Sequence, residues 1–272
     1  MKKKLVAVLL TACLAMVVVA GCGSSSSRRT TSSKTSTKND SKTFVIGVDD
    51  TFPPMGFRNK KNKIVGFDID LAREAAKRMN MKFKVQAINW DTKEMELNKG
   101  NIDAIWNGLS ITEERKKKMD FTTPYLQNDQ VIVVKKDSSI ASKDDLAGKT
   151  VGCQKGSSAE DALEADPIYK KIKGGKPTEF DENVSCFQDL DAGRIDAMVV
   201  DSVVAKYYIA KHHSNFKIVG ESLQPEQYGV AVKKGNTKML NKIQKALDDM
   251  KADGTAGKIS KKWFGEDIIY NK

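Results

Sequence analysis

Two hydrophobic patterns alternate along the chain from residue 43 onward. Short β-branched runs predict buried strands, and the segments between them place apolar residues at helical spacing. The clearest helix covers 68–79, where Ile69, Ala72 and Ala76 share one face. Further strands are predicted at 44–48, 82–87, 102–106, 131–134, 150–153 and 178–180, and helices at 90–99, from 159 onward, and at 187–190, 237–252 and 258–264. Strands that alternate with helices predict an α/β fold with mainly parallel pairing.

A five-residue pattern, G-x-I-D-A, occurs at 100–104 and again at 193–197. Each copy leads into a short apolar run that ends in polar residues, Asn107-Gly108 first and Asp201-Ser202 second. The order of strands and helices around the two copies also agrees. We therefore predict two similar α/β lobes, whose loops after the strands would face a ligand.

The chain must pass between two such lobes twice. Val131–Val134 would be the strand entered on the first crossing, and Gln227–Val232 would be the return crossing. Lobe 1 is accordingly predicted to comprise 43–128 and 227–272, and lobe 2 to comprise 129–226. Two crossings form a hinge, so a ligand could be enclosed when the lobes close.

The first 42 residues differ from the rest. Lys2–Lys4 precede the apolar run Leu5–Ala20, which is typical of a secretory signal and short for a transmembrane helix. The run ends in Val-Ala-Gly-Cys22, which resembles a bacterial lipobox and implies removal of 1–21 and lipidation of Cys22. Residues 22–42 are mostly Ser, Thr and Lys, and we predict a disordered tether.

The net charge of +11 does not indicate a nucleic-acid partner. Eight lysine or arginine residues and one aspartate lie in 1–42, so the remaining chain carries only +4. No stripe of basic and aromatic residues appears there, and we expect no nucleic-acid partner. No CxxC or His-x-x-His pattern occurs, and we predict neither a metal nor a cofactor.

Two cysteines remain after the leader is removed and Cys22 is lipidated. Cys153 and Cys186 would lie in an exported domain, where disulfides persist. A Cys153–Cys186 disulfide and a pair of buried free thiols are both compatible with the sequence.

The stretch 107–125 carries the strongest candidate chemistry. Ser110 or Thr112 would cap a helix that begins with two glutamates, and Arg115 follows in its first turn. Free backbone N–H groups beside a guanidinium suit a carboxylate. An ordinary solvated helix is the alternative that the stretch by itself allows.

Several ordered motifs resemble the amino-acid-binding proteins of bacterial ABC importers, the family 3 extracellular solute-binding proteins. They are IGVDDTFPPMGF, IVGFDIDLAREAAKRM, GNIDAIWNGLSITEERKKKMDFTTPY, VGCQKGSSAEDAL, GRIDAMVVD and ADGTAGKISKKWFG, and they span about residues 43–266. The resemblance implies a two-lobed periplasmic-binding-protein fold of type II, the "Venus flytrap". It also implies a lipid-anchored, monomeric receptor on the extracytoplasmic face of the cell membrane. Such a receptor passes a polar L-amino acid to a permease and its ATPases.

The resemblance assigns site residues by position. Arg115 matches the arginine that pairs with the ligand carboxylate, and Asp201 matches the acid that receives the ammonium. Asp49 matches a second acid near the ligand, or else caps a turn. The remaining ligand-binding positions that the resemblance implies are Phe52, Trp90, Asn107, Gly108, Ser110, Gln154, Ser157 and Ser158. Phe52 and Trp90 would also be explained by packing alone.

Two other functions fit the same fold. An enzyme that resembles cyclohexadienyl dehydratase would need a general acid or base in the cleft. A sensor would need a separate signalling chain. Within the receptor hypothesis, a cationic amino acid, glutamine and cystine all remain open as ligands.

Overall fold

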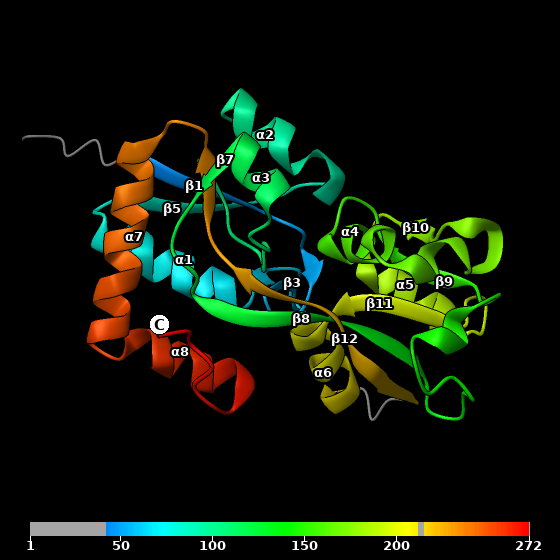
Figure 1. The fold of residues 1–272 in the computed structure, drawn as a ribbon. Helices are drawn as coiled ribbons and strands as arrows, with labels where there is room; N and C mark the ends of the chain where they lie inside the picture. Colours follow the sequence, from blue (N-terminus) through cyan, green and yellow to red (C-terminus); the bar gives the residue numbers. More distant parts are fainter. Residues whose placement is uncertain (1–41, 212–214, 272) are drawn as a thin grey trace, which may run out of the picture. The chain divides into compact units, whose positions relative to one another are not determined.

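The alternating strands and helices fold around two separate five-stranded sheets. The structure is a computed structural model that describes residues 42–211 and 215–271 (Figure 1). By contacts, the chain divides into Met1–Asn39 and Asp40–Lys272, and the sheets belong to the second unit. The predicted signal peptide 1–21, Cys22 and the tether, apart from Lys42, lie outside the described residues.

The sheet of lobe 1 has the strand order β5-β1-β6-β13-β7. Its strands are β1 (Thr43–Val48), β5 (Lys82–Ala87), β6 (Ala104–Ile105), β7 (Met119–Phe121) and β13 (Ala231–Lys233). β1 pairs in parallel with β5 and β6, whereas β13 is antiparallel to its neighbours. A small sheet of β2 (Thr51–Phe52), β3 (Gly56–Arg58) and β4 (Ile64–Val65) follows β1.

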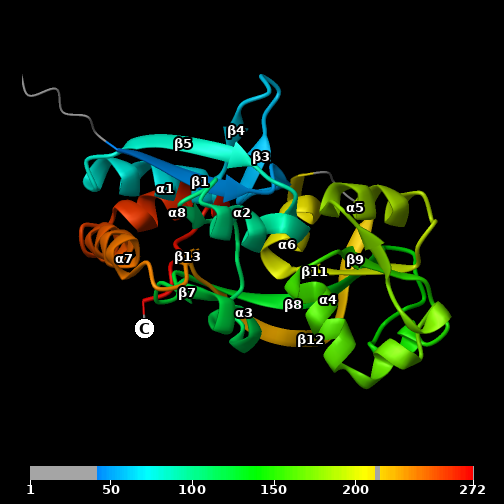
Figure 2. The ribbon, with the colours of Figure 1, turned by 90° about the horizontal axis from the view of Figure 1, so that it is seen from above.

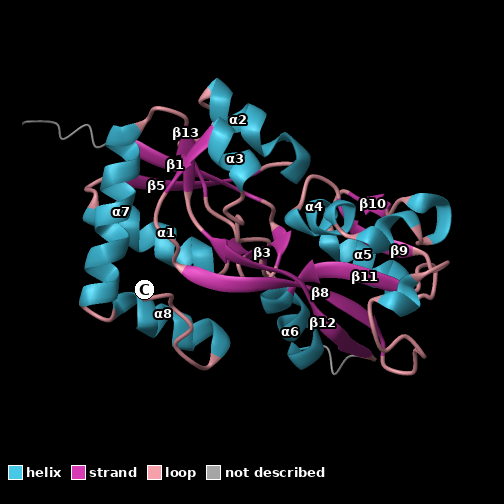
Figure 3. Cartoon of the chain, viewed as in Figure 1, coloured by secondary structure: helices cyan, strands magenta, loops and turns pink. Residues whose placement is uncertain are grey.

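Five α-helices cover the sheet of lobe 1. They are α1 (Phe67–Arg78), α2 (Lys93–Lys99), α3 (Glu113–Lys118), α7 (Thr237–Ala252) and α8 (Thr255–Phe264), with a 3-10 turn at Trp90–Thr92 before α2. Helices α1, α7 and α8 contact one another, and Figure 3 shows them on the side away from α2 and α3. The buried face of α1 includes Ile69, Ala72 and Ala76, as the apolar spacing predicts.

The sheet of lobe 2 has the order β10-β9-β11-β8-β12. Its strands are β8 (Leu126–Lys135), β9 (Val151–Gln154), β10 (Thr178–Phe180), β11 (Ala197–Asp201) and β12 (Phe216–Tyr228). Its helices are α4 (Ser158–Ala165), α5 (Asn183–Asp191) and α6 (Ser202–Lys211), with 3-10 turns at Asp144–Leu146, Pro167–Lys170 and Lys173–Gly175. The two sheets give an α/β fold with two lobes, as expected for the periplasmic-binding-protein fold of type II that the sequence resembles.

Strands β8 and β12 connect the lobes. They pair antiparallel from Phe216 opposite Lys135 to Tyr228 opposite Leu126, with an irregularity between Val219 and Gln224. Figure 2 shows both strands running from the helices of lobe 1 toward those of lobe 2. Tyr228 also forms an isolated bridge with Ser110 of lobe 1. The hinge therefore consists of two long paired strands.

The sequence pattern gave wrong bounds for these strands and missed one helix. β8 begins at Leu126 rather than Val131, because two polar residues of its first half, Asn128 and Gln130, are buried against other polar groups instead of ending the strand. The predicted return strand 227–232 is divided, since β12 ends at Tyr228 and β13 begins at Ala231. Helix α6 had no clear apolar stripe in its sequence, and only its first four residues are buried.

Of the two alternatives that the sequence left open for the cysteines, the structure shows the free thiols, because Cys153 and Cys186 are both buried and unpaired. A Cβ added to Gly152 would lie 2.7 Å from the Cys186 sulfur, so Cys186 faces the Gly152 side of β9. Neighbouring residues of a strand point to opposite faces, so Cys153 packs on the other side, with a different core cluster. Burial raises the pKa of both thiols.

Candidate functional site

A small cavity of about 10 Å³, enough for little more than one water molecule, lies where the two lobes meet. Ten of the residues predicted for ligand binding line it: Asp49, Phe52, Trp90, Asn107, Gly108, Arg115, Gln154, Ser157, Ser158 and Asp201. The eleventh, Ser110, is buried beside it, and its hydroxyl oxygen lies 2.9 Å from that of Ser158. The fold thus brings together residues that are up to 152 positions apart in the sequence, from Asp49 to Asp201.

Arg115 reaches the cavity from the first turn of α3. The Thr112 hydroxyl caps this helix by accepting a hydrogen bond from the Arg115 N–H at 3.1 Å. The guanidinium is buried, and it donates from Nη1 to the Ser110 carbonyl at 3.0 Å and from Nη2 to the Gly156 carbonyl at 3.3 Å. Burial lowers the pKa of Arg115, but a guanidinium remains charged in proteins.

The neighbours of Arg115 behave differently. Lys116 and Lys117 pair with Glu113 and Glu114 on the exposed surface of α3. The solvated-helix interpretation therefore describes the neighbours of Arg115 and not Arg115 itself.

Asp201 ends β11 on the opposite lobe. Its Oδ1 atom accepts hydrogen bonds from the Asn128 amide at 2.6 Å, the Gln130 amide at 3.1 Å and the Tyr228 hydroxyl at 2.6 Å. Burial, together with the nearby Glu226 carboxylate, raises the pKa of Asp201 to about 7. Keeping this carboxylate charged is therefore costly unless a cation reaches it.

Glu226 is a second buried acid at this site that the sequence analysis missed. Its Oε1 atom accepts from the Asn128 amide at 2.9 Å and from the Gln130 amide, while its Oε2 atom is buried without a partner among the residues described. Asn128 and Gln130 are two positions apart, so both point to one face of β8. The spacing of Asn128 and Gln130 was the sequence signal for a polar cluster here. It becomes visible only when β8 is recognised over its full length.

Asp49 and Gln154 join the lobes at another wall of the cavity. Asp49 Oδ1 accepts from the Thr51 N–H at 2.8 Å and the Thr51 hydroxyl at 2.7 Å, which is the turn-capping role. Its other oxygen accepts from the Gln154 amide at 2.7 Å. Asp49 is therefore both a turn cap and a cavity residue, and burial raises its pKa.

Gln154 is held by its own lobe as well. Its amide nitrogen also donates to the Asp181 carbonyl at 2.9 Å, and its oxygen accepts from Asn183 at 2.8 Å. All hydrogen-bonding groups of the Gln154 side chain are thus directed by neighbours, which fixes the orientation of its amide toward Asp49.

Asn107 and Gly108 shape the floor of the cavity. The side-chain Oδ1 of Asn107 accepts from the Asp49 N–H at 2.9 Å, and the side-chain Nδ2 is buried with no partner in the described part of the chain. Gly108 has φ +57°, and an added Cβ would lie 2.9 Å from the Phe52 ring. Only glycine fits here without strain.

A buried acid beneath the floor, Asp68, was also missed. Its Oδ2 atom accepts from the Gly108 N–H at 2.7 Å and from the Tyr125 hydroxyl at 2.9 Å, and burial raises its pKa to about 7. Helical spacing places Asp68 on the face of Ala72 and Ala75, a signal that was present in the sequence. Asp68 positions the Gly108 peptide that lines the cavity.

The aromatic and serine residues complete the walls. Phe52 and Trp90 are buried at the cavity, although packing would account for their burial as well. Ser157 caps α4 by accepting from the Glu160 N–H at 3.3 Å. The positive end of α4 therefore points at the cavity beside Ser158.

Comparison of this chain with known proteins agrees with this architecture. The sequence profile of the bacterial extracellular solute-binding proteins, family 3, matches residues 44–266. The L-cystine-binding protein TcyJ of Escherichia coli K12 is 34% identical over 228 residues, which cover 83% of this chain and 84% of that protein.

Solved structures show the same similarity. A substrate-binding protein of an ABC uptake transporter from Streptococcus pneumoniae, with bound histidine, has a TM-score of 0.82 and 38% identity, and the match covers 84% of this chain and 95% of that one. An ancestral arginine-binding protein with bound arginine has a TM-score of 0.77 and 45% identity, covering 82% and 98%. This chain therefore belongs to the bacterial extracellular solute-binding proteins of family 3.

Proposed function

We propose that this protein is a monomeric extracytoplasmic receptor that binds a polar L-amino acid between its lobes. It then delivers the amino acid to the permease of an ABC importer and its ATPase subunits. One observation carries this proposal, namely that Arg115 and Asp201 are buried at one cavity and come from opposite lobes. The names of related proteins, which include binding proteins for cystine, glutamine and arginine, support it.

The α-groups of an amino acid fit these two residues. A ligand carboxylate would accept hydrogen bonds from the Arg115 guanidinium and from the free backbone N–H groups at the start of α4. A ligand ammonium would reach Asp201 at Oδ2, because Oδ1 already accepts three hydrogen bonds. A zwitterion would thus bridge the lobes and favour their closed arrangement, which is the differential affinity that drives closure.

The side-chain end of the cavity favours a hydrogen-bond donor. Three of the roughly four lone-pair positions of Asp49 are used by Thr51 and Gln154, which leaves one for a ligand. Phe52 and Trp90 also line the cavity, and aromatic rings attract a nearby cation. We propose a cationic amino acid as the preferred ligand, with L-arginine first, since a buried carboxylate gains more from a cation than from an amide.

A ligand screen tests the receptor and its specificity together. Thermal unfolding is followed with L-arginine, L-lysine, L-histidine, L-glutamine, L-cystine and L-ornithine, because a ligand of the native state raises the unfolding temperature by mass action. Isothermal titration calorimetry then measures the affinity of every amino acid that raises it. The specificity proposal fails if L-glutamine or L-cystine binds more tightly than every cationic amino acid. The receptor proposal fails if none of the six binds.

The proposal treats the protein as a binding protein and not as an enzyme. The related proteins named above bind amino acids, which supports this assignment. The raised pKa of Asp201 would also suit a general acid, so the dehydratase alternative deserves a direct assay. Incubation with prephenate and with each bound amino acid, followed by mass spectrometry, should show no product.

We also propose that Cys22 is lipidated and holds the protein at the outer face of the membrane. Across 42–211 and 215–271, no helix is long and apolar enough to cross a membrane. Mass spectrometry of the N-terminal peptide of the mature protein should find diacylated Cys22, and Cys22→Ala should be released from membranes. An unmodified Cys22 in membrane-bound protein would contradict the proposal.

A further inference from the structure

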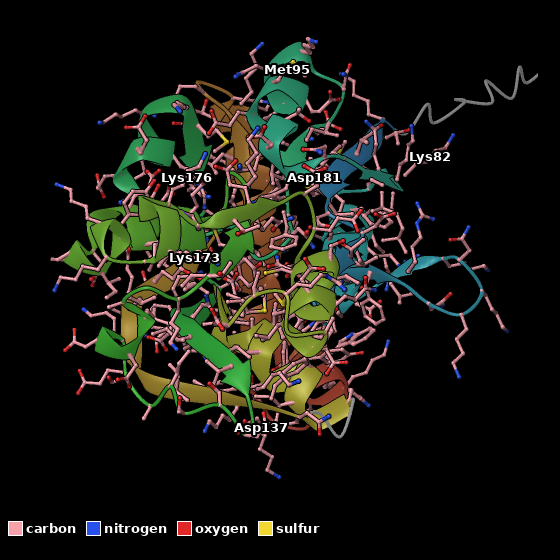
Figure 4. The ribbon with its side chains drawn as sticks, turned by 90° about the vertical axis from the view of Figure 1, so that its right-hand side faces the viewer. Lys82, Met95, Asp137, Lys173, Lys176 and Asp181 are labelled. Atoms are coloured by element: carbon pink, nitrogen blue, oxygen red, sulfur yellow. The ribbon has the colours of Figure 1, made fainter. Side chains whose placement is uncertain are left out.

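Two side chains of helix α2 are placed contrary to their polarity, although Leu97 of the same helix is buried as expected. Lys93 is 4% exposed, whereas Met95 on the same helix is 43% exposed. Figure 4 shows Met95 on the outer surface of α2. Burying a lysine is unfavourable unless its ammonium finds partners, so the partners of Lys93 indicate why it is inside.

The partners of Lys93 lie on both lobes. Its ammonium donates to the Trp90 carbonyl of lobe 1 at 3.2 Å and to the Gly156 carbonyl of lobe 2 at 2.8 Å. It also lies 5.1 Å from the centre of the Trp90 ring. Lys93 does not line the cavity, but its ammonium is hydrogen-bonded to Trp90 and Gly156, which lie beside the cavity.

The Gly156 carbonyl is the acceptor for two cations of lobe 1. Arg115 donates to the same oxygen at 3.3 Å, which is longer than the 2.8 Å contact of Lys93. The Gly156 peptide is held in place from its own lobe, because its N–H donates to Glu160 at 2.7 Å. Gly156 also has φ +67°, the left-handed backbone that turns this loop toward lobe 1.

We propose that Lys93 is a positioning residue for ligand binding that joins the lobes at Gly156 without touching the ligand. This inference rests on the proposed function above. By supplying the shorter hydrogen bond to the Gly156 carbonyl, Lys93 leaves the Arg115 guanidinium available for the ligand carboxylate. The contact also joins lobe 1 to lobe 2, so it stabilises only the arrangement that encloses the ligand and slows ligand release.

A nearby ion pair offers a matched control. Lys155 lies one residue before Gly156 and pairs with Asp91 of lobe 1 at 3.0 Å, but their side chains are 47% and 43% exposed. Exposed pairs contribute little, so Lys155→Met should lower affinity less than about 5-fold. A buried hydrogen bond from a charged donor contributes more, so Lys93→Met should lower it about 10- to 100-fold.

The experiment compares wild type, Lys93→Met, Lys93→Gln and Lys155→Met, with L-arginine as the probe. If L-arginine does not bind wild type, the amino acid of highest affinity in the six-member screen replaces it. Calorimetry measures affinity, and stopped-flow tryptophan fluorescence measures release. We expect the Lys93→Met loss mainly in faster release, partial recovery in Lys93→Gln, and ligand-free unfolding temperatures no lower than that of wild type.

The outcomes separate this inference from the proposed function. Failure of wild type to bind any of the six amino acids removes the proposed function and this inference with it. If wild type binds and Lys93→Met binds equally well, only the role of Lys93 is overturned. It is also overturned if Lys93→Met and Lys155→Met lose affinity equally, or if the Lys93→Met loss differs between bound amino acids, which would indicate direct ligand contact. Should Lys93→Met fail to fold, wild-type affinity in Lys93→Gln overturns it.

Discussion

Replacement of Asp201 by asparagine should weaken amino-acid binding and stabilise the ligand-free protein. The pKa of this carboxyl is raised from 3.8 to about 7. A buried acid whose pKa is raised by folding leaves stability intact at pH values below its pKa in the unfolded chain. Stability is then lost as the pH rises through its pKa in the folded protein. At pH 8 the charged form therefore costs free energy that asparagine, which does not ionise, avoids.

The size of this effect follows from the pKa difference. A difference from 3.8 to about 7 corresponds to on the order of 4 kcal/mol, and Glu226 accounts for part of it. We therefore expect Asp201→Asn to raise the free energy of unfolding at pH 8 by about 2–4 kcal/mol. The asparagine oxygen can keep the three hydrogen bonds that Oδ1 accepts, so little else should change.

Binding should change in the opposite direction. Truncating one partner of a buried charge pair costs about 2–5 kcal/mol, so the affinity for L-arginine should fall about 30- to 5,000-fold. The analogue of L-arginine that lacks the α-amino group should lose less than about 5-fold, since it has no ammonium for Asp201. In wild type, the affinity for L-arginine should fall as pH drops below about 7, because Asp201 becomes protonated.

Urea unfolding at pH 5 and pH 8 without ligand measures the first effect, and calorimetry at the same pH values measures the second. The gain in stability of Asp201→Asn over wild type should be larger at pH 8 than at pH 5. A variant that is less stable than wild type at pH 8 would refute the electrostatic argument. Equal losses for L-arginine and its analogue would refute the assignment of Asp201 to the ammonium.

Three further predictions concern other residues. Arg115→Ala should lower amino-acid affinity at least about 100-fold in calorimetry while the protein still folds, because the ligand carboxylate loses its guanidinium; an unchanged affinity would contradict its role. Gly108→Ala should lower the free energy of unfolding in urea by about 1–3 kcal/mol more than the control Gly100→Ala. Both glycines have positive φ, but of the two only Gly108 has an aromatic ring within 3 Å of an added Cβ. Equal losses in the two variants would count against the packing argument. Both Cys153 and Cys186 should be alkylated in denatured, unreduced protein, as detected by peptide mass spectrometry, and protection of both would restore the disulfide.

Much of this protein could be predicted from local sequence. The helical spacing in 68–79 and the β-branched runs correspond to α1 and to strands such as β1 and β9, because they depend on short-range periodicity. The repeated G-x-I-D-A segment indicated two lobes. The resemblance to a family named eleven site residues, and ten of them line one cavity with Ser110 beside it, while their role in ligand binding stays a prediction.

Tertiary structure decided the features that depend on contacts between distant segments. Cys153 and Cys186 pack on opposite faces of β9, in different core clusters, and this arrangement keeps apart two thiols that the sequence left free to pair. The partners of Asp201 come from β8 and β12, whose polar residues resemble loop sequence until the strands pair. No local pattern distinguishes Lys93 from the other lysines of the chain, and its ammonium is buried where Gly156 of the other lobe approaches it. Sequence periodicity determines which segments become strands and helices, whereas the cost of a buried charge depends on partners that only the folded chain brings within reach.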